Sequence, residues 1–470
     1  MTTENRTYEE LSVGDEASIQ RLCRAEDLYV FAHASGNHNP MHLPDADGDG
    51  DGVPEGVAPA MWIGSLISAV LGNILPGPGT LYVGQTFRFG ERAMAGDTLT
   101  VGVRVRAKKS DRVVVLDTWV RHHDGVMVAE GEAEVIAPER KMTFDDGHIP
   151  GLTVQRHVHF DHLLERARHL PPMVVAVAAP ESPDSLEGAL LAARHGLIDP
   201  VLFGDESRIR GLARELDEDL SGVRIVDIHD HGAAAAAATK MVHDGDAAAL
   251  MKGHLHTDEL LHHVVKREGG LRGRRRLSHI FVMDVPGLDH LLLITDAAIN
   301  IAPDLATKVD IVQNAIDLAH GLGIRTPKVG VLAAVETVNE KMPATIDAAV
   351  LAKMAERGQI TGGAVDGPLA MDNALSMAAA RTKGIMGDVA GRAEVLVAPD
   401  LQSGNMIAKQ LTYLAHAEAG GIVMGARAPV ILTSRSDDEK ARLASCAIAA
   451  LYARWLARAA APAAPKAAAE

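Results

Sequence analysis

From Pro171 onward, short apolar runs alternate with helical patterns, and this alternation constrains the fold more than any other feature of the sequence. The run MVVAVAAP precedes LEGALLAARHG, PVLFGD precedes SRIRGLAREL, and AALMKG precedes TDELLHHVV. Three later runs, KVGVLAAVE, EVLVAPD and IVMGARAPVILTSR, are each followed by a helical pattern of their own. Because parallel strands need crossover helices, the alternation predicts a mostly parallel sheet with helices on both faces.

Polar residues end several of these predicted strands. They are Lys252, Asp296, Glu336, Asp366, Asp400 and Ser434. Ligands of parallel α/β sheets bind beyond the carboxyl ends of the strands, so we expect these side chains to gather at the ligand site. Residues 399–409 and 429–435 each pass from an apolar run through small polar residues into a helical pattern. Backbone N–H groups at a helix start attract anions, so both stretches predict a ligand that carries phosphate.

The first 150 residues have a different pattern, which is typical of an α+β domain. The expected helices cover residues 25–35 and 59–75, and the expected strands cover 99–106, 112–120 and 126–136. The strands alternate apolar and polar side chains, as half-buried antiparallel strands do. One long apolar helix followed by an antiparallel meander predicts a helix wrapped by a curved sheet.

The chain of 470 residues is too long for one ordinary core. We predict an N-terminal domain over 1–150, a linker over 151–170 that contains one amphipathic helix, and a second domain over 171–458. The Ala/Pro-rich end, 459–470, has the composition of a disordered tail.

Composition excludes several classes of partner. The net charge of −16 argues against nucleic acid. No apolar run reaches the roughly 18 residues of a membrane span, and the N-terminus is too acidic for a secretory signal. Cys23 and Cys446 lie far apart without metal-like spacing, so neither a disulfide framework nor a metal site is expected. These features indicate a cytoplasmic protein.

Seven motifs of the second half resemble, in order and spacing, those of the phosphate acetyl- and butyryltransferases. They are LMKG (250–253), LSHIFVMD (277–284), TDAAINIAPDL (295–305), PKVGVLAAVE (327–336), VDGPLAMDNA (365–374), APDLQSGNMIAK (398–409) and TSR (433–435). The resemblance covers about residues 170–455. It implies two α/β subdomains of the isocitrate/isopropylmalate dehydrogenase-like fold with an active cleft between them. It also implies reversible acyl transfer between CoA and phosphate, with neither a metal nor a bound cofactor.

The resemblance assigns the chemistry to a Ser-Arg pair, which here is Ser434 and Arg435. A guanidinium can grip phosphate with two parallel hydrogen bonds, and the hydroxyl can bind the reacting thiol or carbonyl. The family's proposed base, an Asp six residues beyond the Arg, is replaced by Ala441, which leaves Asp437 and Asp438 as the nearest carboxylates. The alternative interpretation is local: Ser434 caps the following helix, and the carboxylates suit its first turn.

The strand ends, the helix start at 399–409 and the basic run 266–276 suggest a set of residues that bind substrate. They are Lys252, Asp296, Asp366, Asp400, Gly404, Asn405 and Lys409, together with Arg272, Arg274 and Arg275 as a seat for the CoA phosphates. Asn405 and Lys409 lie four apart, on one helical face. Each also has a structural alternative: Gly404 serves close packing, Asp366 forms a turn, and the basic run is a solvated face or pairs with a partner subunit.

The segment DLYVFAHASGNHNPMH, residues 27–42, resembles the MaoC-like (R)-specific enoyl-CoA hydratases, and the resemblance extends over about 5–137. It implies a hot-dog fold and the addition of water across the double bond of an enoyl-CoA by an Asp and a His. His42 matches that His, but the Asp position holds Asn37. An amide cannot accept a proton, and loss of a general base costs about two to four decades in rate.

We therefore expect a weak or inactive hydratase domain, unless Asn37 still positions a water or His38 acts as the base. The domain can instead serve dimerisation or acyl-CoA capture. Residues 45–52, DADGDGDG, replace the substrate-side loop, and they resemble a calcium-binding EF-hand loop except that the twelfth position from Asp45 is Gly56. We interpret this segment as a flexible acidic loop.

Together these patterns predict a hot-dog domain fused to an active phosphate acyltransferase. Its substrates would be acyl-CoA, phosphate and acyl phosphate, and both resembling families imply a homo-oligomer. Two alternatives stay open: an enzyme in which both domains turn over, and a non-catalytic acyl-CoA-binding regulator or scaffold.

Overall fold

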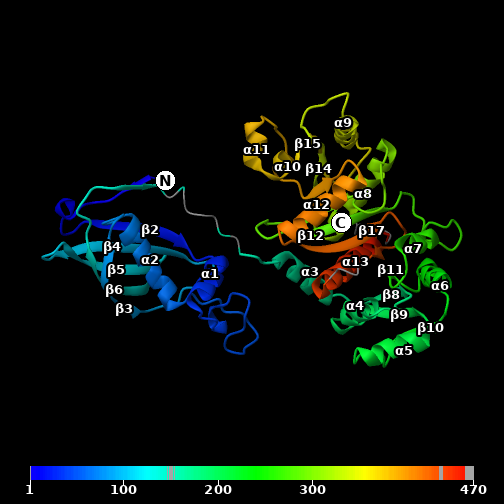
Figure 1. Cartoon of the computed structure of the whole chain (residues 1–470), viewed down its shortest axis with the longest axis horizontal. Helices are drawn as coiled ribbons and strands as arrows, with labels where there is room; N and C mark the ends of the chain where they lie inside the picture. The colour runs from blue at the N-terminus through cyan, green and yellow to red at the C-terminus, as the bar shows by residue number, and fades with distance from the viewer. Residues whose placement is uncertain (1, 146, 148–151, 153, 433–437, 461–470) are drawn as a thin grey trace, which may run out of the picture. The chain divides into compact units, whose positions relative to one another are not determined.

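A computed structural model describes residues 2–145, 147, 152, 154–432 and 438–460. The chain forms two compact units, Met1–Val154 and Gln155–Glu470, each with its own core (Figure 1). The second unit begins inside the segment predicted as a linker.

The described residues of the first unit form two α-helices, two short 3₁₀ helices and seven strands. In chain order its elements are β1 (Thr2–Glu4), η1 (Tyr8–Glu10), β2 (Glu16–Leu22), α1 (Ala25–Ser35), η2 (Pro40–His42), α2 (Ala60–Asn73), β3 (Leu81–Phe89), β4 (Thr98–Lys108), β5 (Val113–His122), β6 (Met127–Ile136) and β7 (Thr143–Asp145).

Five of these strands form one antiparallel sheet in the order β2-β4-β5-β6-β3. Along β4, Val103 and Val105 are buried whereas Arg104 is exposed, because successive side chains of a strand point to opposite faces. The buried face packs against α2, whose Ile67 and Val70 have no exposed surface. A sheet wrapped around a central helix is the hot-dog fold, so the predicted architecture is confirmed.

The second unit alternates strands and helices, as predicted. In chain order its elements are α3 (Val158–Arg168), β8 (Met173–Ala178), α4 (Pro183–Arg194), β9 (Ile198–Gly204), α5 (Glu206–Glu215), β10 (Arg224–Asp227), α6 (His231–Asp244), β11 (Ala249–Lys252), α7 (Thr257–Val264), β12 (Ser278–Asp284), β13 (Leu292–Thr295), α8 (Leu305–Gly321), β14 (Lys328–Leu332), α9 (Pro343–Glu356), β15 (Ala364–Leu369), α10 (Met371–Leu375), α11 (Met377–Thr382), β16 (Val395–Val397), α12 (Leu401–Leu414), β17 (Glu418–Met424), β18 (Val430–Ile431) and α13 (Glu439–Ala460).

Its eleven strands form one sheet in the order β10-β9-β8-β11-β18-β17-β12-β13-β16-β14-β15. The pairs are parallel except at the centre, where β17 is antiparallel to β18 and to β12, and β12 is antiparallel to β13. As a result, β8 to β11 and β18 run one way, whereas β13 to β16 run the other way.

This reversal corrects the expectation that the strand-end polar residues share one edge. Lys252 ends β11 at one edge of the sheet, whereas Asp296 and Asp400 follow β13 and β16 at the opposite edge. Asp366 lies inside β15 rather than at its end. Hydrophobic patterns carry no strand direction, so the sequence could not distinguish the two edges.

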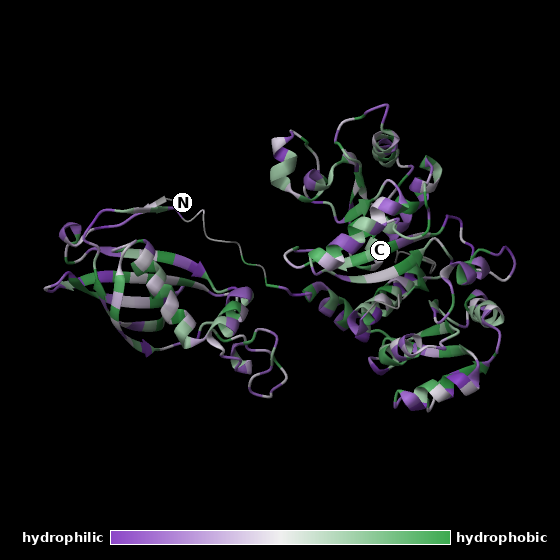
Figure 2. Cartoon of the chain, in the orientation of Figure 1, coloured by the Kyte–Doolittle hydropathy of each residue, from purple (hydrophilic) through white to green (hydrophobic). Residues whose placement is uncertain are grey.

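Helices cover both faces of this sheet (Figure 1). Along β8, Val175 and Val177 belong to the core that includes α4, α8 and α13. Ala176 and Ala178 face the opposite way, into a core with α6 and α7. A third core lies under α10, α11 and α12. The strands are accordingly the most apolar part of the unit (Figure 2), as expected for a sheet buried on both sides.

Helix α3 belongs to the second unit, although it lies within the predicted linker 151–170. Phe160 and Leu163 are buried in the same core as α13, and the Phe160 N–H donates to the Asp284 carboxylate at 2.8 Å. Among the described helices, none is both long and apolar enough to cross a membrane.

Both cysteines are buried free thiols, Cys23 in the first unit and Cys446 in the second. Burial raises the pKa of each thiol to about 12, because a thiolate is poorly solvated in an apolar core. We predict that neither thiol reacts rapidly with a disulfide reagent at pH 8 in the native chain, whereas both react once the chain is unfolded. A thiol that reacts within seconds before unfolding would contradict this packing.

Candidate active site

Three of the predicted catalytic residues, Ser434, Arg435 and Asp437, lie outside the described residues. The chain on either side of them is described. On the N-terminal side, β18 ends beside β11, with Ile431 opposite Met251. On the C-terminal side, α13 begins at Glu439. The segment that carries the predicted Ser-Arg pair therefore follows a strand at the carboxyl edge that β8, β9, β10 and β11 share.

Asp438 acts as the cap of α13. Its Oδ1 accepts the Ala441 N–H at 2.8 Å, which satisfies one of the free donors at the helix start. The alternative role of Ser434, as the cap of this helix, is thus already filled by Asp438. Ala441 itself is buried, at 8% exposure.

Asp296 is a buried anchor rather than an exposed ligand of substrate. Its carboxylate accepts the backbone N–H groups of His279, Ala298, Ile299 and Asn300 at 2.9–3.1 Å, and the Asn300 side-chain amide at 2.6 Å. The residue is 2% exposed. A carboxylate with five donors fixes the loop after β13, and this corrects its assignment as a residue that contacts substrate.

The start of α12 packs tightly against that loop. A Cβ added at Gly404 would lie 2.4 Å from the Asp296 carbonyl oxygen, so only glycine fits there. The Asn405 amide donates to the Ala297 carbonyl at 3.2 Å. Asp400 Oδ1 accepts both the backbone N–H and the hydroxyl of Ser403 at 2.8 Å. The protein's own carboxylate therefore occupies the helix start that the sequence predicted to hold phosphate.

Three other predicted binding residues, Lys252, Lys409 and Asp366, have side chains that are partly or fully exposed. The Lys252 ammonium lies 3.3 Å from the Gly253 carbonyl and 3.4 Å from the Leu255 carbonyl, at the carboxyl end of β11. Lys409 is exposed on α12. Asp366 accepts the N–H of the next residue, Gly367, at 2.8 Å, and both residues lie within strand β15 rather than in the turn given as its alternative.

Glu336 belongs to an ion-pair group that the sequence analysis did not identify. Lys383 lies 3.1 Å from Glu336 and 3.2 Å from Asp372. The Glu336 backbone N–H and the Lys383 ammonium hold the pKa of the Glu336 carboxyl below its usual value. Because Lys383 lies on a segment without a motif, only the tertiary structure places it beside Glu336.

The arginines of the basic run 266–276 differ in their exposure: Arg275 is partly buried, whereas Arg272 and Arg274 are exposed. Arg275 pairs with Asp317 of α8 at 2.5 Å and lies 3.4 Å from the Asn314 side-chain oxygen, so its guanidinium is committed to the fold. The assignment of Arg275 to CoA stays a prediction. Arg272 and Arg274 are exposed and stay available for an anionic ligand.

A second group that the sequence analysis missed centres on Glu181, at the carboxyl end of β8. Glu181 is 3% exposed. Its Oε2 lies 3.1 Å from His231 Nε2 and 3.2 Å from Arg208 Nη1. Glu181 follows an apolar strand, and this position is the signal in the sequence that could have identified it.

In the first unit, the predicted hydratase-like residues lie in the connection between α1 and α2. His42 Nδ1 is 2.8 Å from the Val57 carbonyl oxygen, so this nitrogen carries the proton and donates it. The exposed Asn37 accepts the Asn39 N–H at 3.3 Å. The imidazole is therefore held in one tautomer, with Nε2 left for other partners.

The acidic loop that follows forms hydrogen bonds within itself, and its flexibility stays a prediction. Asp47 accepts the Gly52 and Gly50 N–H groups, which lower the pKa of its carboxyl. Oxygen atoms of Asp47, Asp49, Asp51 and Glu55 lie within 4.8 Å of one another. Glu55, the fourth member of this acidic group, is the eleventh residue from Asp45, whereas an EF-hand loop has its Glu at the twelfth position, here Gly56.

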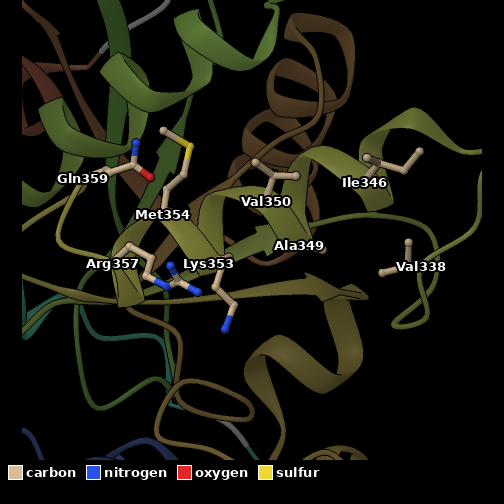
Figure 3. A pocket seen from close by; sticks show the side chains of 8 residues that line it. All are labelled: Val338, Ile346, Ala349, Val350, Lys353, Met354, Arg357 and Gln359. Carbon is tan, nitrogen blue, oxygen red and sulfur yellow. The ribbon is translucent and has the colours of Figure 1, made fainter.

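A shallow apolar groove runs along α9 of the second unit (Figure 3). Ile346, Val350 and Met354 line it, with Lys353 and Arg357 beside them. None of the predicted site residues lines this groove, so we do not assign it to the reaction.

The close contact at Gly404 leads to a stability prediction. Gly404→Ala should destabilise the second unit by about 1–3 kcal/mol, because the new methyl group overlaps the Asp296 carbonyl. The matched control is Gly211→Ala on α5, where a Cβ meets nothing within 4 Å and the gain in helix propensity should leave stability equal or higher. Calorimetry of both variants measures the difference, and equal melting temperatures would rule out the overlap.

Comparisons with known proteins agree with this fold. Residues 231–450 match the family model described as phosphate acetyl/butaryl transferase. The chain is 56% identical over 294 residues to a phosphate acetyltransferase of Rhizobium meliloti, and the match covers 63% of this chain and 93% of that protein.

Two solved structures are also similar. A branched-chain phosphotransacylase from Enterococcus faecalis V583 is 32% identical, with a TM-score of 0.54, over 60% of this chain and 99% of that one. The R-hydratase PhaJ1 from Pseudomonas aeruginosa in the unliganded form is 37% identical, with a TM-score of 0.32, over 33% of this chain and 100% of that one. Because the chain is 56% identical to the R. meliloti protein over 93% of that protein, it belongs to the phosphate acetyl/butyryltransferase family.

Proposed function

We propose that this protein transfers a short acyl group reversibly between CoA and inorganic phosphate, with Ser434 and Arg435 at the centre of the reaction. The observation that carries the proposal is the 56% identity to a phosphate acetyltransferase over 93% of that protein. The Ser-Arg pair comes shortly after β18 in the sequence, and ligands of parallel α/β sheets bind beyond the carboxyl ends of the strands.

Both directions of the reaction need the same groups. In the direction that makes acyl-CoA, the thiol sulfur bonds to the acyl carbon, the carbon–oxygen bond to phosphate breaks, and phosphate leaves. Arg435 holds the phosphate by paired, charge-assisted hydrogen bonds, and Ser434 binds the thiol or the carbonyl. Lys252, Lys409, Arg272 and Arg274 supply positive charge for the anionic substrates.

Two further expectations belong to this proposal. We infer that Asp366 and Asn405 shape the cleft, and that the subunits assemble as a homo-oligomer, as the sequence resemblance implies. CoA takes part as a substrate and not as a bound cofactor.

The Arg435→Ala variant tests the proposal. Arsenate replaces phosphate and gives acyl arsenate, which hydrolyses, so the wild type should release free CoA from acetyl- or butyryl-CoA when arsenate is present. Loss of the guanidinium should lower kcat/KM about 10²–10³-fold, as loss of a preorganised donor does. Thiol release measures the rate, and exposed Arg458→Ala is the matched control. Absence of arsenate-dependent release by the wild type would exclude the transferase.

A second activity, weak hydration of enoyl-CoA by the first unit, is favoured by one observation. The His42 imidazole is held through Nδ1 by the Val57 carbonyl, which leaves Nε2 to exchange a proton with substrate or water. Asn37 stands where the resembling hydratases have an Asp, so it can hold a water but cannot take its proton.

This interpretation predicts a gain of function. Asn37→Asp should raise the rate of crotonyl-CoA hydration by about 10²–10⁴, because it supplies the missing general base. Loss of absorbance of the conjugated thioester follows the reaction, and Asn37→Ala is the control that should remain slow. A wild type that is already as fast as Asn37→Asp would instead support full bifunctionality. If no variant turns over, the remaining interpretation of the unit is dimerisation or acyl-CoA capture.

A further inference from the structure

The buried Glu181 is held in place by an unusual backbone turn at the carboxyl end of β8. Ala179, two residues earlier, has a φ of 50°, in the left-handed region that costs energy for any residue other than glycine. The Asp205 N–H donates to Glu181 Oε1 at 3.1 Å. A Cβ at Gly204 would lie 2.9 Å from the same oxygen. The fold thus reserves space for a carboxylate that is almost fully removed from water.

The His231 imidazole contacts the Glu181 carboxylate. It is the first residue of α6, and its Nε2 is 3.1 Å from Glu181 Oε2. Its side chain is 32% exposed, so the ring reaches from the buried carboxylate to solvent. A neutral imidazole that donates Nε2–H to a carboxylate keeps a lone pair on Nδ1. This arrangement of a buried carboxylate and a half-exposed imidazole is that of an oriented general base.

The pair lies at the edge of the sheet that leads to the proposed reaction site. Strands β8, β11 and β18 are neighbours and run parallel, so their carboxyl ends share one edge. Two strand spacings, about 10 Å, separate β8 from β18. Helix α6 packs against β8, β9 and β11, which holds His231 at this edge. Ser434 and Arg435 follow β18 in the sequence.

Two other carboxylates near the start of α13 are already engaged within the described residues, whereas Asp437 lies outside them. Asp438 caps α13 through Oδ1. Glu418, at the start of β17, is 3.0 Å from His157 and 3.2 Å from Lys440, between α3 and α13, and burial raises the pKa of its carboxyl. Ala441 has no side chain that can accept a proton. Of these groups, His231 is the one held in place by a buried carboxylate with a nitrogen left to accept a proton.

We infer that His231 accepts the proton of the CoA thiol and that Glu181 is the residue that positions it; this inference rests on the proposed acyl transfer. The S–H bond breaks and its proton goes to His231 Nδ1. The sulfur electron pair bonds to the acyl carbon, and the bond from that carbon to the phosphate oxygen breaks. Phosphate leaves with that electron pair, and in the reverse direction the imidazolium returns the proton to sulfur.

Several charged or titratable groups surround His231 and contribute to any pH profile. They are Glu181 from β8, Asp205 and Arg208 at the start of α5, His229 and Asp230 in the preceding loop, His254 after β11, and Glu259 from α7. His229 pairs with Asp205 at 2.9 Å, and the His254 ring centroid lies 6.3 Å from that of His231.

The experiment compares His231→Ala with the wild type in the direction that consumes acetyl phosphate and CoA. At pH 7 the variant should lose about 10²–10⁴ in kcat/KM, the usual contribution of a general base. The deficit should shrink as the pH approaches about 8.5, the ordinary pKa of a thiol, because solution then supplies the thiolate. Added imidazole should restore part of the rate. Formation of the thioester bond, followed by absorbance, measures each rate.

Glu181→Gln tests the positioning role separately, since it retains the shape of the side chain and removes the charge. It should lower kcat by about 10²-fold with little change in KM, because the ring then loses its preferred tautomer. Exposed His169→Ala, on the C-terminal side of α3, is the matched control and should match the wild type.

Three results would overturn the inference. One is a loss below 3-fold in His231→Ala, and another is a loss of equal size at every pH without rescue by imidazole, which would indicate a structural role. The third is an inactive wild type, which removes the proposed function as well. An active wild type together with either of the first two results would remove only the role of His231.

Discussion

The antiparallel pairing of β17 with β12 and β18 is the interaction on which the rest of the second unit depends. It joins two sets of parallel strands that run in opposite directions within one sheet. Each set has its own carboxyl edge, so the polar loops that follow the strands form two groups rather than one. At the first of these edges, after β8, β11 and β18, Lys252 and His231 are partly exposed, whereas the loop after β13 is closed around Asp296.

Buried carboxylates hold the loops at both edges. At Asp296, five N–H donors surround one carboxylate, and Gly404 lets α12 approach closely enough to cover it. At Glu181, the carboxylate has fewer donors and contacts the His231 imidazole and the Arg208 guanidinium. Burial makes an unpaired charge costly, so the first arrangement favours rigidity, whereas the second keeps a half-exposed imidazole in a fixed orientation. The two carboxylates look alike in sequence, because each follows an apolar strand.

Local features of the fold could be predicted from the sequence with good accuracy. Helix α1 covers the predicted residues 25–35, and Gly36, with a φ of 72°, ends it as a left-handed cap. The half-buried strands of the first unit follow from their alternation. Strand direction and long-range partners could not be predicted: Arg275 reaches Asp317 of α8, and Asp296 meets donors from β12. These partners come from elements that no local pattern connects.

The environment of Ala441 explains why this position carries no base for the proposed transfer. Ala441 is 8% exposed on the first turns of α13, and its carbonyl oxygen accepts the buried Ser445 hydroxyl at 2.9 Å. A carboxylate there would lose most of its hydration unless it reached the open edge. With alanine at this position, α13 packs directly on β17, and position 441 offers the thiol no proton acceptor. A proton acceptor on a neighbouring strand end, such as the imidazole held by Glu181, satisfies both the packing of α13 and the chemistry of the thiol.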